Sequence, residues 1–282
     1  MWEAVSPSSP LTIIGCGKMG GALARGWLKA GVPESNFLIV DPVAAKTGVS
    51  GVSCSCVFPS IEDLPRDVFP SIFVLAIKPQ IFADILPHLE GYLSHDPLFL
   101  SVAAGISVQS MRGMLGENSG QAAIVRAMPN TPAAIGKGIS ALYAADTVSE
   151  DQKQVAAAMM KVVGKTVWVD SEDQMNAVTG LSGSGPAYVF HMVEALANAG
   201  VVMGLSEDVA MELARETVVG AGALMDHDSR TVRDLRVEVT SPNGTTAAGL
   251  DVLMGTDPSL SQLMRNTVRA AKKRAEELSA PS

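Results

Sequence analysis

The chain has 282 residues, of which 47% are apolar and 18% charged, and its formal net charge is −8. This length allows two medium-sized domains, and the apolar excess excludes a disordered chain and favours a homo-oligomer that hides more surface than a monomer. The acidic balance argues against a general nucleic-acid-binding protein, because phosphate binding needs clustered Lys and Arg.

The cysteines and the chain start limit the compartment and the metal chemistry. Cys16, Cys54 and Cys56 are too few for a disulfide framework, and Cys54-Ser-Cys56 lacks the second ligand pair that a zinc site needs. Residues 1–10 do not have the pattern of a secretory signal, and no apolar run reaches the roughly 20 residues of a membrane-spanning helix. We therefore expect a cytoplasmic protein with no metal site and no membrane partner.

In chain order, the first half alternates short apolar runs with helix-length segments. The first helical segment extends from about Met19 to Ala30. Such runs are typical of parallel strands that are covered on both faces. They lie at residues 11–14, 37–40, 72–76, 98–102 and 123–126. The pattern predicts an α/β fold with a doubly wound, Rossmann-type sheet, to which residues 139–143 and 166–169 add edge strands.

A capping box predicts the helix between those two edge strands, since Ser149 and Gln152 fit Ser-x-x-Gln. After about residue 170 the strand patterns stop and helical patterns replace them. These cover residues 173–180, 186–203, 206–226, 231–239, 245–254 and 258–278. We therefore predict a dinucleotide-binding domain at residues 1–170 and an all-helical domain at residues 171–282.

A glycine-rich turn follows the first strand and opens the first helix. Gly15-Cys16-Gly17-Lys18-Met19-Gly20 matches G-x-G-x-x-G. In this motif the first glycine permits a tight turn, the second lets a pyrophosphate approach the backbone, and the third lets the helix pack closely on the strand. The phosphates then meet the positive end of the helix, so the motif predicts a bound nicotinamide dinucleotide.

An acidic residue, Asp41, ends the second strand. A carboxylate at this position accepts hydrogen bonds from the adenosine ribose and repels a 2′-phosphate, which favours NAD over NADP. The alternative is that Asp41, which precedes Pro42, only starts a turn.

Further loops at the carboxyl ends of strands are expected to line the cofactor, because ligands bind there in such sheets. One loop contains Ala76, Ile77, Lys78 and Pro79, and another contains Ala103 and Ala104. A third, residues 126–132, has two prolines and is expected to hold Asn130 near the nicotinamide.

The helical half has two clusters of small and hydroxyl-bearing residues, at residues 180–188 and 240–246, and each leads into a helix. Such turns offer free N–H groups and a positive helix end to an anion, and a small carboxylate fits. Plain helix capping and close helix packing are the alternative interpretation.

Together with the glycine-rich turn and residues 126–132, these clusters resemble pyrroline-5-carboxylate reductase, from about Leu11 to Leu278. The resemblance implies NAD(P)H-dependent reduction of 1-pyrroline-5-carboxylate to L-proline, in the last step of proline biosynthesis. It also implies homodimers built through the helical domain, which is then the substrate-binding and dimerisation domain, and larger rings such as decamers.

The resemblance also implies site residues. Substrate contacts map onto Ser241, Gly244, Thr245 and Thr246, with the Thr246 hydroxyl near the ring nitrogen as the catalytic group, and by position onto Glu172. The chain departs from the family at two places. Asn243 replaces a glycine of the family's turn, and Glu238 replaces an asparagine that meets the cofactor in some relatives, so that role is not carried over.

The chemistry implied is hydride transfer to a protonated cyclic imine, which needs no strong general acid. This agrees with the positions of His88, His95, His191 and His227, none of which lies in a motif. One alternative is a 3-hydroxyacid dehydrogenase, but residues 186–203 lack the lysine that this class places on a helix of its second domain. Another is a non-catalytic NAD(H)-binding sensor, which the fold alone would permit.

Overall fold

The computed structural model describes residues 5–49, 51–255 and 257–279. The chain divides into two compact units, which are described separately. The first contains Met1–Gly183 together with Ala271–Ser282, and the second contains Ser184–Ala270. These units do not decide where a functional boundary lies, so the division at residue 170 stays a prediction. None of the helices in the described ranges is long and apolar enough to cross a membrane.

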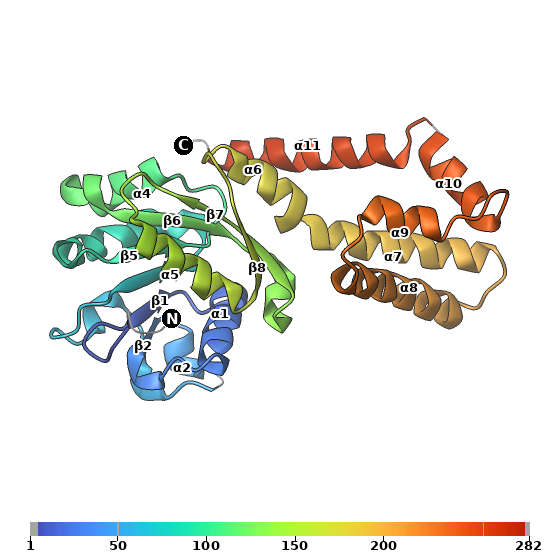
Figure 1. Ribbon diagram of the computed structural model, residues 1–282. Coiled ribbons are helices and arrows are strands. Elements are labelled where there is room, and N and C mark those ends of the chain that lie inside the picture. The colour runs from blue at the N-terminus through green and yellow to red at the C-terminus, as the bar shows by residue number, and fades with distance from the viewer. Residues whose placement is uncertain (1–4, 50, 256, 280–282) are drawn as a thin grey trace. The chain divides into compact units, whose positions relative to one another are not determined.

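The first unit is built on an eight-stranded sheet in the order β3-β2-β1-β4-β5-β6-β7-β8 (Figure 1). All pairings are parallel except β6 with β7, which is antiparallel. The strands are β1 (Leu11–Ile14), β2 (Phe37–Val40), β3 (Val57–Phe58), β4 (Ile72–Leu75), β5 (Leu98–Ser101), β6 (Ala123–Met128), β7 (Gly138–Ala144) and β8 (Gly164–Trp168). The α/β fold with a mostly parallel sheet and a helical second half is therefore confirmed.

The burial of the central strands explains their composition. Every residue of β1, β2, β4 and β5 is buried, because helices cover both faces of a parallel sheet. The helices of this unit are α1 (Lys18–Lys29), α2 (Ala44–Thr47), α3 (Phe82–Ile85), α4 (Val108–Leu115), α5 (Glu150–Lys161) and α6 (Gln174–Val178). The Trp27 indole N–H donates to the Met159 carbonyl at 2.8 Å, which joins α1 to the end of α5.

The strand order creates the crevice in which ligands bind. The chain builds β2 and β3 on one side of β1 and then returns to build β4 and β5 on the other. The loops after β1 and β4 therefore diverge at the carboxyl edge of the sheet, and this switch point is where α/β proteins of this kind bind ligands.

The start of α5 confirms the predicted capping box. The Ser149 hydroxyl accepts a hydrogen bond from Gln152 N at 3.2 Å, and the Gln152 side chain accepts one from Ser149 N at 3.0 Å. The two added edge strands are also present, each within two residues of its predicted ends. The sequence patterns missed β3, which has only two residues and is half-buried.

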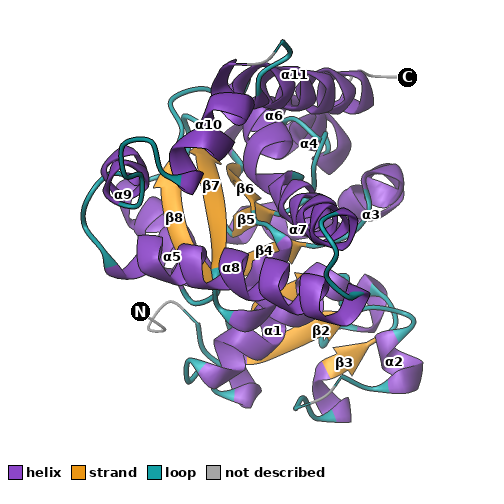
Figure 2. Ribbon diagram, turned by 90° about the vertical axis from the view of Figure 1, so that its right-hand side faces the viewer, coloured by secondary structure: helices purple, strands orange, loops and turns teal. Residues whose placement is uncertain are grey.

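The second unit consists of helices, and none of its described residues forms a strand (Figure 2). They are α7 (Gly185–Val202), α8 (Glu207–His227), α9 (Val232–Glu238), α10 (Thr245–Gly255) and α11 (Leu260–Ser279), whose last residues belong to the first unit. Small residues join α7 to α8, since a Cβ on Gly200 would lie 3.1 Å from the Ala210 Cβ.

This unit leaves much apolar surface uncovered in the single chain. Phe190, Val202 and Met203 are 64%, 78% and 79% exposed. Among its described residues, the buried apolar side chains are Ala197, Ala210, Ala214 and Leu235, which are too small and too few to form a core. Apolar helix faces of this extent mark a protein–protein interface.

Candidate active site

Each of the three glycines of the motif is needed at its position for a different physical reason. Gly15 has φ +92°, and a Cβ there would lie 2.7 Å from the Ala76 carbonyl oxygen. A Cβ on Gly20 would collide with the Gly15 carbonyl oxygen, so α1 packs directly on the turn. Around Gly17, apart from its two chain neighbours, no described residue has an atom within 4 Å of the Cβ position, which leaves the backbone open to a ligand.

The first turn of α1 opens at Gly17 and is suited to an anion. Gly17 is the N-cap, and within the described structure no side chain caps the helix and no acidic residue lies in its first turn. The unpaired N–H groups and the positive end of the helix dipole therefore remain available for phosphate. Lys18 and Met19 form this first turn, and Lys18 adds a positive charge to it.

The carboxylate of Asp41 is occupied by backbone donors. Its Oδ2 accepts from Cys16 N at 2.7 Å, and its Oδ1 accepts from Val43 N at 2.8 Å and Ala44 N at 2.9 Å. Asp41 thus starts a turn, as the alternative interpretation held, and it also fixes the glycine-rich turn. Burial raises the pKa of the Cys16 thiol, the nearby Asp41 charge raises it further, and Arg25 lowers it.

A pocket of about 560 Å³ lies beside the glycine-rich turn. It brings together several predicted cofactor residues, namely Gly15, Gly17, Asp41, Ala76, Ile77 and Lys78. Pro79 follows at the start of a 3₁₀ turn, η4 (Pro79–Ile81). The apolar walls suit the flat rings of a dinucleotide. The lining residues that the sequence patterns missed include Pro59, Ser60, Ile61, Glu62, Ile81, Ile85 and His88.

Two further 3₁₀ segments supply Ile61, Glu62 and His88. They are η3 (Ile61–Asp63) and η5 (Leu86–His95), and a contact between the Glu62 carboxylate and His88 Nδ1 joins them. The signal in the sequence was weak, because η3 follows the two-residue strand β3 and η5 has no regular helical pattern.

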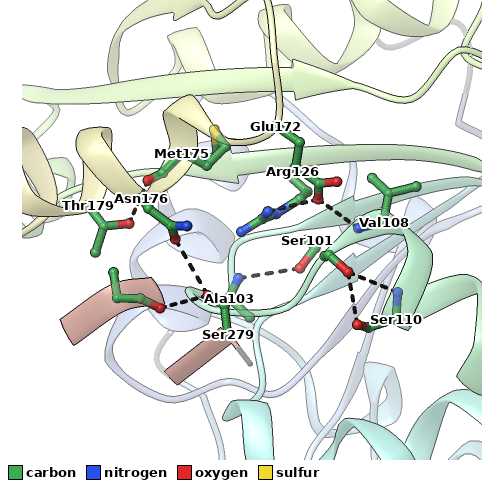
Figure 3. Close-up of polar contacts among 12 residues, drawn as sticks. Ser101, Ala103, Val108, Ser110, Arg126, Glu172, Met175, Asn176, Thr179 and Ser279 are labelled. Atoms are coloured by element: carbon green, nitrogen blue, oxygen red, sulfur yellow. Dashed lines mark hydrogen bonds and ion pairs between the residues drawn. The ribbon is translucent and has the colours of Figure 1, made fainter. Parts of the chain in front are cut away.

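The loop after β5 contains Ala103 and Ala104, and Figure 3 shows the contact between Ala103 and Ser101 at its start. Ala103 N donates to the Ser101 hydroxyl at 3.4 Å. Gly105, with φ +79°, leaves room for the end of α11, since a Cβ there would lie 3.4 Å from the Leu278 carbonyl oxygen. Ala103 and Ala104 are not among the residues that line the 560 Å³ pocket.

Glu172 pairs with a buried arginine in the first unit (Figure 3). Its Oε1 accepts from Arg126 Nη1 at 2.8 Å and from Val108 N, at the start of α4, at 2.7 Å. The Arg126 side chain is 8% exposed and that of Glu172 is 26% exposed. The pair connects β6, α4 and the segment before α6. A contact of Glu172 with the substrate stays a prediction, and Oε2 is the oxygen that would make it.

Asn130 is also engaged within the first unit. Its Oδ1 accepts from Ile139 N at 3.0 Å, and its Nδ2 donates to the Ser182 carbonyl at 3.2 Å. Ser182 belongs to a π-helical turn, η8 (Thr179–Gly183), and a Cβ on Gly183 would lie 2.7 Å from the Met128 methyl carbon. Asn130 therefore anchors the first small-residue cluster, and its contact with a cofactor stays a prediction.

The second small-residue cluster forms a tight turn before α10. Gly244 N donates to the Ser241 carbonyl at 3.1 Å, with Pro242 at the second position and Asn243, at φ +59°, at the third. This is the pattern of a type II turn, in which the third position needs a positive φ. A Cβ on Gly244 would collide with the Ser241 hydroxyl, and Thr245 and Thr246 then begin α10.

Glu238, the other departure, pairs with a cation in the second unit. Arg230 Nη2 lies 3.0 Å from its Oε2 and 2.6 Å from Asp228 Oδ2. Hydrogen bonds from Arg230 lower the pKa of Asp228 to about 2. Within the described ranges, no three His, Cys, Asp or Glu side chains gather in a way that holds a metal ion.

A Rossmann-type sheet with a phosphate-binding turn and a helical second unit defines a dinucleotide-dependent oxidoreductase. Residues 10–105 match the model of a family described as NADP oxidoreductase, coenzyme F420-dependent, and residues 172–278 match that of pyrroline-5-carboxylate reductase dimerisation. A soybean (Glycine max) pyrroline-5-carboxylate reductase is 36% identical over 96% of this chain and 97% of its own length.

Solved structures show the same relationship. A pyrroline-5-carboxylate reductase from Coxiella burnetii has a TM-score of 0.87 and 33% identity, covering 97% of this chain and 100% of that chain. A pyrroline carboxylate reductase from Plasmodium falciparum, with NADP bound, has a TM-score of 0.79 and 29% identity over 97% and 99% of the two chains. The chain belongs to the pyrroline-5-carboxylate reductase family.

Proposed function

We propose that this chain reduces 1-pyrroline-5-carboxylate to L-proline with a nicotinamide dinucleotide bound at the glycine-rich turn. The observation that carries the proposal is the open backbone at Gly17 at the start of α1, in a chain of which 96% aligns with a pyrroline-5-carboxylate reductase. Gly17 leaves the backbone open to a ligand, and the free N–H groups at the start of α1 can donate hydrogen bonds to the pyrophosphate.

The reaction needs orientation more than acid catalysis. When bound, the reduced nicotinamide supplies a hydride to C5 of the ring, whose protonated imine nitrogen then becomes a secondary amine. Positioning therefore accounts for most of the rate that the protein supplies. Since the imine already carries its proton, no side chain has to donate one in this step.

The substrate is assigned to the turn before α10. In this proposal the Thr246 hydroxyl hydrogen-bonds the ring nitrogen, and the backbone around Thr245 holds the carboxylate at the positive end of α10. Ser241 and Gly244 shape the turn, since the Ser241 carbonyl accepts from Gly244 N at 3.1 Å. The support for this assignment is a small, tightly packed turn at the N-terminus of α10, a helix of 11 residues.

Substitution of Thr246 tests this assignment. The Thr246→Ala variant is expected to lose roughly tenfold to a thousandfold in kcat/KM, the range for a hydrogen bond lost at a reacting centre. Thr246→Ser keeps the hydroxyl and serves as the matched control, with most of the activity retained. If the alanine variant kept the parent kcat/KM, the role of Thr246 would be wrong.

We further propose that NADH is the preferred donor. Of the charged side chains that line the pocket within the described ranges, Asp41 and Glu62 are acidic, and the basic ones are Lys78 and His88. Acidic groups on the β2 side disfavour a 2′-phosphate. A titration with both reduced cofactors tests this preference, and clearly tighter binding of NADPH would contradict it.

The assembly we propose is a homodimer formed through the helical unit, and dimers that associate into a decamer. The support is the match of residues 172–278 to a dimerisation family and the exposed apolar faces of α7 and α8. Sedimentation equilibrium tests both levels, since a monomer contradicts the first and a dimer alone contradicts the second. A cytoplasmic location also stays a prediction, which cell fractionation tests.

A further inference from the structure

Two acidic side chains line the proposed adenosine end of the pocket. Asp41 follows β2, and Glu62 lies in the loop after β3. The two loops run side by side, because Asp41 N donates to the Phe58 carbonyl at 2.9 Å. In the sheet order both lie on the opposite side of β1 from the Ala76–Lys78 loop. The adenosine half of a dinucleotide that spans the crevice therefore meets Asp41 and Glu62.

Asp41 has little capacity left for a ligand. A carboxylate offers about four acceptor positions, and three backbone N–H groups already occupy three of those of Asp41. The same three dipoles offset part of its negative charge. The main task of Asp41 is to hold Cys16 and the turn at Val43 in place, which both cofactors need equally.

Glu62, in contrast to Asp41, is accessible to a ligand. Its side chain is 58% exposed and lines the same pocket, so a ribose can reach it. Its own backbone N–H and the Ser60 hydroxyl lower the pKa of its carboxyl, and His88 lowers it further. The carboxylate faces His88 Nδ1, so the imidazole must carry a proton on that nitrogen to donate to it. His88 thus orients Glu62 from the neighbouring segment.

We propose that Glu62, oriented by His88, is the residue that sets the preference for NADH over NADPH. Its carboxylate accepts from the ribose hydroxyls and repels a 2′-phosphate, whereas Asp41 holds the phosphate-binding turn. This inference rests on the proposed binding of a dinucleotide at the glycine-rich turn. It assigns cofactor discrimination to a loop that the dinucleotide sequence motif does not include.

Cofactor binding tests the assignment without depending on the reaction. The dissociation constants of NADH and NADPH are measured by quenching of protein fluorescence for the parent, Glu62→Gln and Glu62→Lys. The ratio of the two constants is expected to move toward NADPH by roughly tenfold in Glu62→Gln and by more in Glu62→Lys. His88→Ala should move the ratio in the same direction by less, because Glu62 keeps its charge but loses its orientation.

Two control variants separate this role from general charge and from folding. Glu117→Lys makes the same change in net charge at an exposed position outside the pocket, and it should leave the ratio within twofold of the parent. Asp41→Asn should weaken both cofactors by similar factors, because its amide nitrogen would oppose the Cys16 N–H.

The possible outcomes distinguish the role of Glu62 from the proposed NADH preference and from the proposed reaction. A ratio that stays within twofold in both Glu62 variants overturns the inference, and so does a shift toward NADPH in Asp41→Asn larger than that in Glu62→Gln. Parent protein that prefers NADPH contradicts the proposed NADH preference, while the change in ratio on substitution still tests Glu62. Tight NADH binding without turnover of the imine contradicts the proposed reaction and leaves the assignment of Glu62 standing.

Discussion

Removal of the Glu172 carboxylate should destabilise the first unit more than most single substitutions do. Glu172→Ala leaves the Arg126 guanidinium, which is 8% exposed, without its ion-pair partner and takes an acceptor from Val108 N. Breaking a buried pair from one side costs about 3–5 kcal/mol. Since the Glu172 side chain is 26% exposed, water reaches part of the site, and we expect a loss of about 2–4 kcal/mol.

The companion variants identify the cause of that loss. Within the described ranges, Arg126 Nε is buried without a partner, so the guanidinium depends strongly on its contact with Glu172. Arg126→Met combined with Glu172→Ala should therefore lose less than Glu172→Ala alone, because no uncompensated charge remains buried. Glu172→Gln keeps an acceptor for Val108 N and should lie between the parent and the alanine variant.

Urea unfolding at one fixed protein concentration measures these differences, with intrinsic tryptophan fluorescence as the signal. Kinetics on the same variants separate positioning from substrate contact. If Glu172 acts through Arg126, Arg126→Met reproduces the loss of kcat/KM seen in Glu172→Ala. A Glu172→Ala protein as stable as the parent, or a double variant less stable than the single one, would show that the Arg126–Glu172 pair does not stabilise the first unit.

Substitutions at three further elements test the glycine-rich turn, the turn before α10 and the cap of α5. Gly20→Ala should lose about 1–3 kcal/mol in the free energy of unfolding, because its methyl group would collide with the Gly15 carbonyl oxygen. Gly17→Ala should fold normally and bind cofactor weakly. Equal urea midpoints for the two variants would contradict this difference. Asn243→Ala should lose about 1 kcal/mol at φ +59° and raise the KM for the imine, while Asn243→Gly stays close to the parent in both measurements. Ser149→Ala should lose about 0.5–2 kcal/mol in urea unfolding with kcat unchanged, and a change in kcat would show that the cap reaches the site.

Local rules explain why much of the fold could be predicted. The fully apolar runs gave the central strands, and the capping box gave the start of α5 to the residue. Asn243, which stands where the family has a glycine, adopts φ +59° in the turn before α10, a conformation that asparagine tolerates better than most other residues. In each case the sequence within a few residues determines the conformation, so a single chain is sufficient.

The side of the pocket that lies next to β3 could not be predicted, because it depends on packing between distant segments. Strand β3 has two residues, and the Glu62–His88 pair joins two 3₁₀ segments that carry no regular pattern. Asp41 shows a related limit. Its position at the end of β2 was evident, but its three backbone donors appear only once the turn is folded.

We propose that the chain transfers hydride from a dinucleotide held at the glycine-rich turn to the five-membered cyclic imine. The most direct measurement follows oxidation of NADH and formation of L-proline from 1-pyrroline-5-carboxylate, with parent and Gly17→Ala proteins side by side. We expect the parent to form NAD⁺ and L-proline in equal amounts, and the variant to lose most of the rate at subsaturating cofactor. A well-folded parent that oxidises neither NADH nor NADPH with this imine would contradict it.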